Sequence, residues 1–445
     1  SIMFMLAALT AIWAFFFYRI SRTLLGTTGA SISAFLLVLL PTTQLSTSAV
    51  MLDIPVALMM LFAMGAYARY LKSERTADAF IFGLWVVASL LVKYNAFALA
   101  LLPPLCVVIA GRHYLWRSKS FWLPAAVVVV IAGPWYFIMR HLVLYAAQPG
   151  SSSPSVAANL AATAKGIVLV AGPVVFVLAV IGSILVSTNR GSRSVRADCK
   201  DRSLYIVAAA MVVAVFIFHG AIYPLYPPRY LLPAAPALIL LSWPAVRYIH
   251  SVLSIRPALA AVALLVVAAA HAASTFSVPA KKTRAYVSAA EAVLSCGLPK
   301  NGAVLVSADP VGEGMLTAEF VMHDRRPDHY VVRASKVLAT QTLMGDEYRL
   351  NYRSPEEIMT LLDSIPIAMV VIEQCRKGGC GEHENVLSQT AIRYPERWRL
   401  SSVVPNETGS PILIYQIAGN EGKALQTLRI DMTYTLGTWV EKQRD

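Results

Sequence analysis

Long apolar runs are the feature that most constrains this chain. Ten of them reach or approach the roughly 20 residues that a helix needs to cross about 30 Å of hydrocarbon. They are residues 2–18, 30–41, 50–70, 79–92, 96–110, 121–139, 166–186, 204–218, 230–245 and 258–273. Only 14% of the 445 residues are charged, against about 25% in soluble proteins. We therefore expect a polytopic α-helical membrane protein with about ten spans.

The positive residues between the runs predict an orientation. When the connecting segments are assigned to alternate sides, fifteen Lys and Arg residues fall on one side and four on the other. Cytoplasmic loops carry the excess of Lys and Arg, so the four are expected outside. These four are Lys93, Arg140, Lys165 and Arg229. The same assignment places everything after about Ser277 outside the cytoplasm.

The formal net charge of +13 fits this orientation. A basic excess in a membrane protein is typical of cytoplasmic loops and of contacts with anionic lipid, so we expect no nucleic-acid partner. The sequence opens at Ser1, directly before an apolar run, and its orientation asks for an odd number of earlier spans if the native N-terminus is cytoplasmic. We therefore expect an N-terminally truncated protein.

The pattern changes at the end of the apolar runs. Strand-sized hydrophobic stretches at 303–307 and 367–372 alternate with a helical stretch at 355–364. The predicted organisation is a transmembrane domain at 1–276 and an extracytoplasmic α/β domain at 277–445.

Two sequence features of this second domain bear on chemistry. Cys375 and Cys380 flank four residues, and in an oxidising compartment we favour a disulfide between them. A metal pair is the alternative, but no second Cys or His pair stands at ligand spacing. His383 and Glu384 have no second histidine at such a spacing and are interpreted as a solvated surface pair.

One carboxylate, Asp53, lies at the expected outer end of the third run. At mid-bilayer a charge costs about 2.5 kcal/mol or more, whereas the outer rim is less costly. The position before Ile54 and Pro55 suits a helix N-cap, whose side chain accepts backbone N–H bonds. A second, functional role for Asp53 remains open.

Basic and aromatic residues gather in the outer loops. Taken singly, each is typical of an interfacial belt or a snorkelling anchor. Taken together with Asp53, they suit the binding of a lipid phosphate through Lys and Arg. The residues are Lys93, Tyr94, Trp135, Tyr136, Arg140, His219, Tyr226, Arg229 and Tyr230.

Four stretches in this order resemble the GT-C superfamily of polyprenyl-phosphate-dependent glycosyltransferases. They are MLDIPVALMMLFAMGAYARYL, GLWVVASLLVKYNAFALALLPPL, GPWYF and PPRYLLPAAPALILL. The branch they resemble includes the lipid A aminoarabinose transferase and the bacterial protein O-mannosyltransferases. The resemblance covers about residues 2–273, together with the plan of an outer C-terminal α/β domain.

The resemblance implies an enzyme of the bacterial inner membrane. It would move a hexosyl or pentosyl group from a polyprenyl-phosphate carrier, with inversion, to a lipid, glycan or protein acceptor on the outer face. Lys93 and Arg229 resemble basic residues near the carrier phosphate, and Trp135 with Tyr136 the segment that lines that cavity. Asp53 resembles an auxiliary acidic residue. The family's main base belongs to a first outer loop, which we expect to precede this sequence.

The resemblance leaves the metal question open. Many relatives carry His where this chain has Arg229, so we predict no metal ligand, although a divalent metal is known in some members. A secondary transporter and a non-catalytic membrane scaffold are the alternative functions. The sequence shows no internal repeat of the kind common in transporters, and no Walker A, HExxH or dinucleotide-binding motif.

Overall fold

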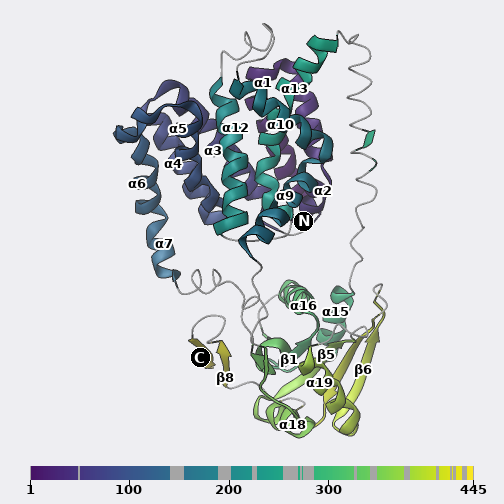
Figure 1. Cartoon of the computed structure of the whole chain (residues 1–445). Coiled ribbons are helices and arrows are strands. Elements are labelled where there is room, and N and C mark those ends of the chain that lie inside the picture. Colours follow the sequence, from purple (N-terminus) through teal and green to yellow (C-terminus); the bar gives the residue numbers. More distant parts are fainter. Residues whose placement is uncertain are drawn as a thin grey trace. The chain divides into compact units, whose positions relative to one another are not determined.

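The computed structural model separates the chain into two compact units. One comprises Ser1–Ile138 and Ser153–Pro279, the other Met139–Ser152 and Ala280–Asp445. The first is helical, and the second contains the sheets (Figure 1). The structure describes residues 2–48, 51–140, 155–188, 202–222, 228–253, 269–270, 273, 285–324, 328–340, 348–374, 381–406, 410–420, 423, 427–432 and 438–443.

Helices make up the whole described part of the first unit. In chain order they are α1 (Ile2–Leu39), α2 (Pro41–Thr47), α3 (Asp53–Ser73), α4 (Thr76–Val92), η1 (Tyr94–Leu101), α5 (Leu102–Ala110), η2 (His113–Arg117), α6 (Lys119–Ile131), α7 (Gly133–Ile138), α9 (Val156–Ala171), α10 (Pro173–Thr188), α12 (Arg202–Ile217), η4 (Phe218–Ile222), η5 (Pro228–Ala234) and α13 (Ala235–Leu253).

Helix α3 lies at the centre of this unit. It packs against α1, α4 and α12, and most of its residues are buried, among them Tyr67 and Tyr70. A helix that is apolar on every side is expected to be surrounded by others rather than to show one face to solvent. The central position explains why the sequence of α3 is apolar on nearly every side: most of its residues contact other helices.

Close packing between α10 and α13 depends on a glycine. A Cβ atom built on Gly182 would overlap the carbonyl oxygen of Leu241. Small residues let helix backbones approach closely in membranes. Gly182 therefore sets the separation of these two helices.

The number of spans is smaller than predicted when length is the criterion. Four helices are long and apolar enough to cross a membrane, within Phe4–Leu39, Asp53–Ser73, Arg202–Ile222 and Pro228–Val252. A fifth is obtained if α9 and α10, bent by 106° at Gly172, count as one span. Three shorter apolar helices are Thr76–Val92, Tyr94–Ala110 and Lys119–Ile131. Ten spans are thus not confirmed in the described residues.

The differences from the prediction have local causes. The first two predicted runs form one helix, α1, with a kink at Gly26, whose φ of 69° lies in the left-handed region. The predicted run 166–186 is divided at Gly172. Most of the run 258–273 lies outside the described residues.

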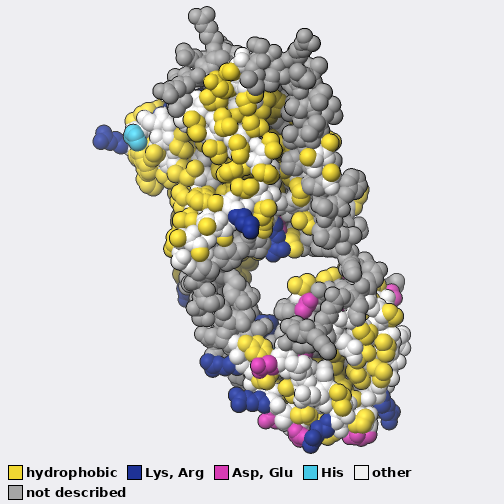
Figure 2. Space-filling model, turned by 45° about the vertical axis from the view of Figure 1, so that its right-hand side comes forward, with side chains coloured by type: hydrophobic (Ala, Val, Ile, Leu, Met, Phe, Trp, Pro, Cys, Tyr) yellow, Lys and Arg dark blue, Asp and Glu magenta, His cyan; other side chains and the backbone are white. Residues whose placement is uncertain are grey.

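The surface of the helical unit is that of a membrane protein. Figure 2 shows hydrophobic side chains over most of the described surface of the upper part, with few charges. In the lower part, acidic and basic side chains are scattered among them. The apolar helices and this surface agree with an integral membrane protein.

The second unit is an α/β structure. Its elements are α15 (Tyr286–Ser295), β1 (Ala303–Ser307), α16 (Pro310–His323), β2 (Tyr330–Arg333), α17 (Ala334–Val337), β3 (Ala339–Thr340), β4 (Arg349–Leu350), α18 (Pro355–Ser364), β5 (Ile367–Glu373), α19 (Glu382–Arg393), β6 (Trp398–Val404), β7 (Ile412–Ile417), β8 (Thr427–Met432) and β9 (Thr438–Gln443). The predicted strands at 303–307 and 367–372 and the helix at 355–364 are confirmed.

Five strands form the main sheet in the order β2-β1-β5-β7-β6. The β2, β1 and β5 strands run parallel, whereas β7 is antiparallel to both β5 and β6. Alternate residues of β1 enter separate cores. Val304 and Val306 pack with α15 and α16, while Ala303 and Leu305 pack with α18 and α19. Helices therefore cover both faces of the parallel part, as such sheets require.

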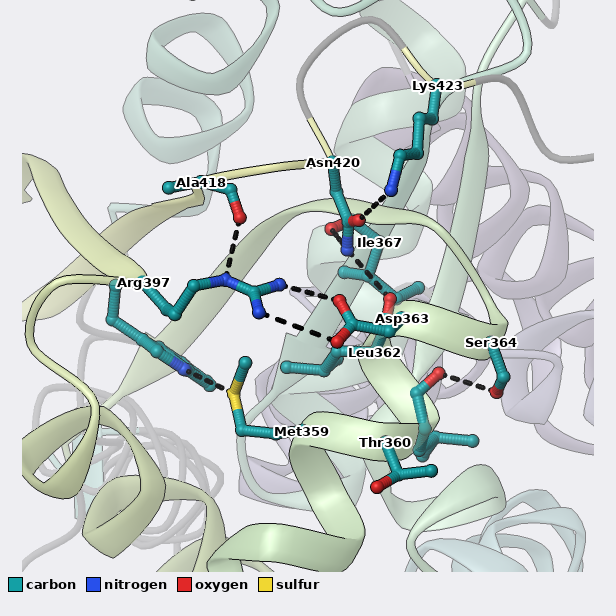
Figure 3. Close-up of polar contacts among 12 residues, drawn as sticks. Met359, Thr360, Leu362, Asp363, Ser364, Ile367, Arg397, Ala418, Asn420 and Lys423 are labelled. Atoms are coloured by element: carbon teal, nitrogen blue, oxygen red, sulfur yellow. Dashed lines mark hydrogen bonds and ion pairs between the residues drawn. The ribbon is translucent and has the colours of Figure 1, made fainter.

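Helix α18 is joined to the β6–β7 hairpin by side-chain bonds (Figure 3). The guanidinium of Arg397 donates to both carboxylate oxygens of Asp363, at 2.6 and 3.5 Å, and to the carbonyl of Ala418. The buried amide of Asn420 donates to the carbonyl oxygens of Leu362 and Ile367, at 2.8 and 3.3 Å. These bonds satisfy backbone acceptors at the turn between α18 and β5.

The interpretation of His383 and Glu384 as a solvated pair is wrong. Their exposed fractions are 5% and 6%, because both face inward from the first turn of α19. Cys375 and Cys380, the predicted disulfide, lie outside the described residues.

Candidate functional site

Asp53 and Lys93 form a buried ion pair in the helical unit. The Lys93 Nζ lies 2.6 Å from Asp53 Oδ1, and the two side chains are 15% and 1% exposed. Asp53 opens α3, whereas Lys93 separates α4 from η1 in an extended conformation. A charge-assisted hydrogen bond of this length is among the stronger polar contacts in a protein.

The N-cap interpretation of Asp53 is wrong. The cap position of α3 is Leu52, and no side chain bonds to the first-turn N–H groups there. Asp53 instead occupies the first helical position, where its charge still meets the positive end of the helix dipole. Its carboxylate turns to Lys93 because an ammonium is a stronger partner than a backbone N–H.

Tyr230 is the centre of a group that we call the Tyr230 cluster: Asp53, Lys93, Asn95, His219, Arg229 and Tyr230. The Lys93 Nζ lies 4.3 Å from the Tyr230 ring centroid, and the Arg229 Cζ lies 5.1 Å from it. The His219 ring stacks on the same ring at 6.4 Å. Cations within about 6 Å of an aromatic face are attracted to it. One ring thus gathers two cations and a histidine.

Two residues of this region were given no site role by the sequence. Asn95 is 1% exposed and donates from its amide to the Tyr230 carbonyl at 3.4 Å. Met51 accepts a bond from Arg229 Nη1 through its sulfur at 3.3 Å. An asparagine in an apolar stretch, two residues after Lys93, was the available signal for Asn95. Nothing in the sequence signals the second.

Three buried polar atoms of the Tyr230 cluster have no partner in the structure. They are Asp53 Oδ2, Asn95 Oδ1 and Arg229 Nε. A buried polar atom without a hydrogen bond costs about 1–3 kcal/mol, so such atoms call for an explanation, of which a bound ligand or water is one. Unused donors and acceptors beside two cations are the composition expected of a binding site for a polar anionic group.

The structure places the other predicted residues outside the cluster. Tyr94 opens η1 directly after Lys93. Tyr136, on α7, donates to the Leu90 carbonyl at 2.8 Å, near the end of α4, and Trp135 beside it is 51% exposed. Arg140 is exposed and belongs to the second compact unit. Tyr226 lies outside the described residues.

The described residues contain no group of three or more His, Cys, Asp or Glu arranged to hold a metal ion. In the Tyr230 cluster the one carboxylate already contacts an ammonium, and Arg229 adds a second positive charge. Such a set suits an anion, because two cations outnumber the single carboxylate.

An apolar cavity of about 330 Å³ lies beside the Lys93 turn. Its wall includes Leu90 of α4, Phe97 of η1 and Trp122 of α6. Leu90 and Phe97 are close in sequence to Lys93, so the cavity adjoins the segment that carries the ammonium.

Comparison with known proteins gives a family-model match for the first part of the chain. Residues 1–138 match the family model described as dolichyl-phosphate-mannose-protein mannosyltransferase. No curated protein sequence gives a significant match.

Solved structures share the fold at low identity. ArnT from Cupriavidus metallidurans bound to undecaprenyl phosphate is 13% identical, with a TM-score of 0.51, and the match covers 95% of this chain and 85% of ArnT. ArnT in the apo state is 14% identical, with a TM-score of 0.50, and the match covers 95% of this chain and 84% of ArnT. An oligosaccharyltransferase of Archaeoglobus fulgidus, in complex with Zn and sulfate, is 13% identical with a TM-score of 0.48; the match covers 84% of this chain but only 56% of that protein.

At such identities the likeness to ArnT is a likeness of fold. The motifs that carried the resemblance in the sequence lie partly within the matched residues 1–138. The family match over residues 1–138 and the ArnT-like fold both agree with the resemblance to polyprenyl-phosphate-dependent glycosyltransferases that the sequence shows.

Proposed function

We propose that this protein transfers a sugar from a polyprenyl-phosphate carrier to an acceptor on the outer face of the bacterial inner membrane. The observation that carries the proposal is the placement of Lys93 and Arg229 over one tyrosine ring, with Asp53 bonded to Lys93. Two fixed cations beside unused polar atoms suit a phosphate that gains charge as the sugar leaves.

The proposed reaction is a displacement at the anomeric carbon. The acceptor oxygen forms a bond to this carbon, the bond from the carbon to the phosphate oxygen breaks, and the electron pair leaves with the phosphate. Attack from the opposite side inverts the configuration. Lys93 and Arg229 stabilise the leaving phosphate, because hydrogen-bond donors aimed at developing charge lower the barrier.

Asp53 is proposed as a positioning residue rather than the base. A carboxylate whose oxygen lies 2.6 Å from an ammonium is less able to take a proton from the acceptor hydroxyl. Its bond holds Lys93 against the Tyr230 ring. The base is assigned, by the resemblance, to a carboxylate of the family's first outer loop.

The purified full-length protein in lipid nanodiscs, supplied with a panel of polyprenyl-phosphate sugars, tests this function. A hydrogen bond to a charged group contributes about 1.5–3 kcal/mol, so Lys93→Ala or Arg229→Ala should raise the donor KM by roughly one to two powers of ten. Lys165→Ala, at an exposed lysine of α9 that is also predicted to lie outside, is the matched control. Transfer from no donor, or equal KM values in all three variants, would overturn the proposal.

The orientation is part of the same proposal. The excess of Lys and Arg in one set of loops supports an outer location for the Lys93 turn and for the α/β unit. Alkaline phosphatase fused after the C-terminus should be active in intact bacteria, because it matures only outside the cytoplasm. If alkaline phosphatase were inactive after the C-terminus but active in the loop after α3, the predicted orientation would be reversed.

A further inference from the structure

The α/β unit has a topological switch point between β1 and β5. From β1 the chain passes through α16 to β2 on one side, and from β2 through α18 to β5 on the other side of β1. The two helices pack on opposite faces of the sheet. In open α/β sheets, ligands bind outside the carboxyl ends of the strands at such a point.

Four carboxylates come together at this edge. Asp309 and Glu313 follow β1, Glu373 ends β5, and Glu384 lies in the first turn of α19. The pKa of Glu384 is raised to about 7 by its burial and by the negative charges of the other three. The electrostatic interaction shows that groups from three segments of the chain are close to one another.

Cations stand beside these carboxylates. Arg333 Nε, at the end of β2, lies 3.0 Å from Glu313 Oε2, and the backbone N–H and the hydroxyl of Ser335 also donate to Glu313. Lys336 lies on α17, three residues after Arg333, and its pKa is lowered by burial and by the charge of Arg333. Titratable groups with shifted pKa values are most often gathered at functional sites.

Two buried polar atoms at the same edge have no partner in the structure. They are Ser307 Oγ, in a residue that is 1% exposed, and His383 Nε2, in a residue that is 5% exposed. Strand alternation places Ser307 on the face of Leu305, which packs in the same core as Leu387 of α19. His383 lies one helical turn before Leu387, toward the carboxyl edge. Both side chains therefore lie at this edge, on the α19 side of the sheet.

The hydrogen bonds of His383 suit the tautomer that carries its hydrogen on Nε2. The Tyr348 hydroxyl accepts from the His383 backbone N–H at 3.0 Å, so its own hydrogen is available to Nδ1 at 2.8 Å. Burial lowers the pKa of His383 to about 4, which keeps the ring neutral at neutral pH. In this tautomer the neutral ring carries its hydrogen on Nε2, which has no partner in the structure.

The chemistry of the edge disfavours two ligand classes, anions and metal ions. An anion is disfavoured because the N-terminus of α16 already has Asp309 bonded to the Gly312 N–H and Glu313 in its first turn. A metal ion is not favoured either, since no three acidic, His or Cys side chains among the described residues are arranged for one. A neutral ligand that both donates and accepts hydrogen bonds remains.

We propose that the switch-point edge of the α/β unit binds the hydroxyl groups of a neutral saccharide. A sugar hydroxyl accepts from His383 Nε2 or Ser307 and donates to a carboxylate at the half-buried rim, where Asp309 lies. Arg333 and Tyr348 are half-buried at the same rim. This site is separate from the Tyr230 cluster and does not depend on the transferase activity.

Saturation-transfer NMR on the full-length protein in nanodiscs tests the proposal. The probes are the methyl glycosides of mannose, glucose and N-acetylglucosamine, with methyl glucuronide as the anionic comparison. A Lys93→Ala background weakens binding at the Tyr230 cluster. We expect transfer to at least one neutral glycoside, little to the glucuronide, and a several-fold weaker signal in Ser307→Ala, whereas Ser388→Ala, at an exposed serine of α19, keeps it.

Three results would overturn the proposal: no transfer to any neutral glycoside, equal transfer to the glucuronide, or a signal that Ser307→Ala leaves unchanged. Hydrogen exchange of β1 and β5 in Ser307→Ala checks that the sheet is intact, so that a lost signal reports binding. His383→Phe is the second variant, because it removes the Nε2 donor through a different element. Failure here leaves the transferase proposal untouched, since glycosyl transfer is measured separately.

Discussion

Replacement of Glu384 by glutamine should remove a pH-dependent loss of stability from α19. Burial and three neighbouring carboxylates raise the pKa of Glu384 from 4.5 to about 7. The folded protein therefore holds a proton between pH 4.5 and 7 that the unfolded chain releases. Stability falls as the pH rises through this window, and the whole penalty is present above pH 7.

The size of the effect follows from the shift. A shift of one pKa unit corresponds to about 1.4 kcal/mol, so the penalty above pH 7 is about 3 kcal/mol. Glu384→Gln removes the charge and keeps the size of the side chain. The variant should be more stable than the parent by about 3 kcal/mol at pH 8 and nearly equal to it below pH 4.5. His383, whose lowered pKa acts in the opposite direction, is common to both proteins and cancels in the difference.

Hydrogen exchange of the α19 amides in the full-length protein measures this difference. At pH 8, after correction for the intrinsic exchange rate, the variant should exchange roughly a hundredfold more slowly. Glu382→Gln, at an exposed glutamate two residues earlier on the same helix, should change little and is the control. Equal protection at pH 8, or a gain that does not vary with pH, would refute a desolvated carboxylate at this position.

Three further predictions concern other parts of the chain. Asp53→Asn should lower the kcat of sugar transfer while the protein remains folded, since the amide cannot hold Lys93 as an ion pair does; unchanged kinetics would limit Asp53 to a structural role. Asn420→Ala should destabilise the α/β unit by about 1–3 kcal/mol in thermal unfolding, because two backbone carbonyls lose their donor; an unchanged midpoint would contradict this. Gly182→Leu should lower the yield of folded protein in size-exclusion chromatography, since its Cβ would overlap the Leu241 carbonyl, and a normal yield would show that α10 and α13 can separate.

The α/β unit shows what local pattern predicts well. The strand at 303–307 and the helix at 355–364 appear as predicted, because a strand-sized apolar run and a Ser354–Pro355 helix start are signals carried by adjacent residues. The burial of His383 and Glu384 was not predicted. Whether a polar pair faces solvent depends on which side of α19 meets the sheet, and α19 has too little apolar sequence to show it.

The Tyr230 cluster was predicted in composition but not in geometry. Topology and charge placed Asp53, Lys93, His219, Arg229 and Tyr230 on one side of the membrane, and the structure brings them together. The pairing of Asp53 with Lys93 was missed because it joins residues 40 positions apart. Local rules describe a carboxylate at a helix start only as a cap, and the competing ammonium comes from another helix.

The same pair has a consequence for how the protein is made. Asp53 opens α3, and Lys93 directly follows α4, the next helix of the chain. The ion pair can therefore form as soon as this helical hairpin leaves the translocon, and neither charge then needs to enter lipid alone. Asn95 and Tyr230, by contrast, are 135 positions apart. Several further helices are therefore synthesised after the ion pair and before Tyr230. Chain order makes assembly of the site a late step of biogenesis in this region, since a nascent chain stalled before η5 would carry the ion pair but neither Arg229 nor the Tyr230 ring.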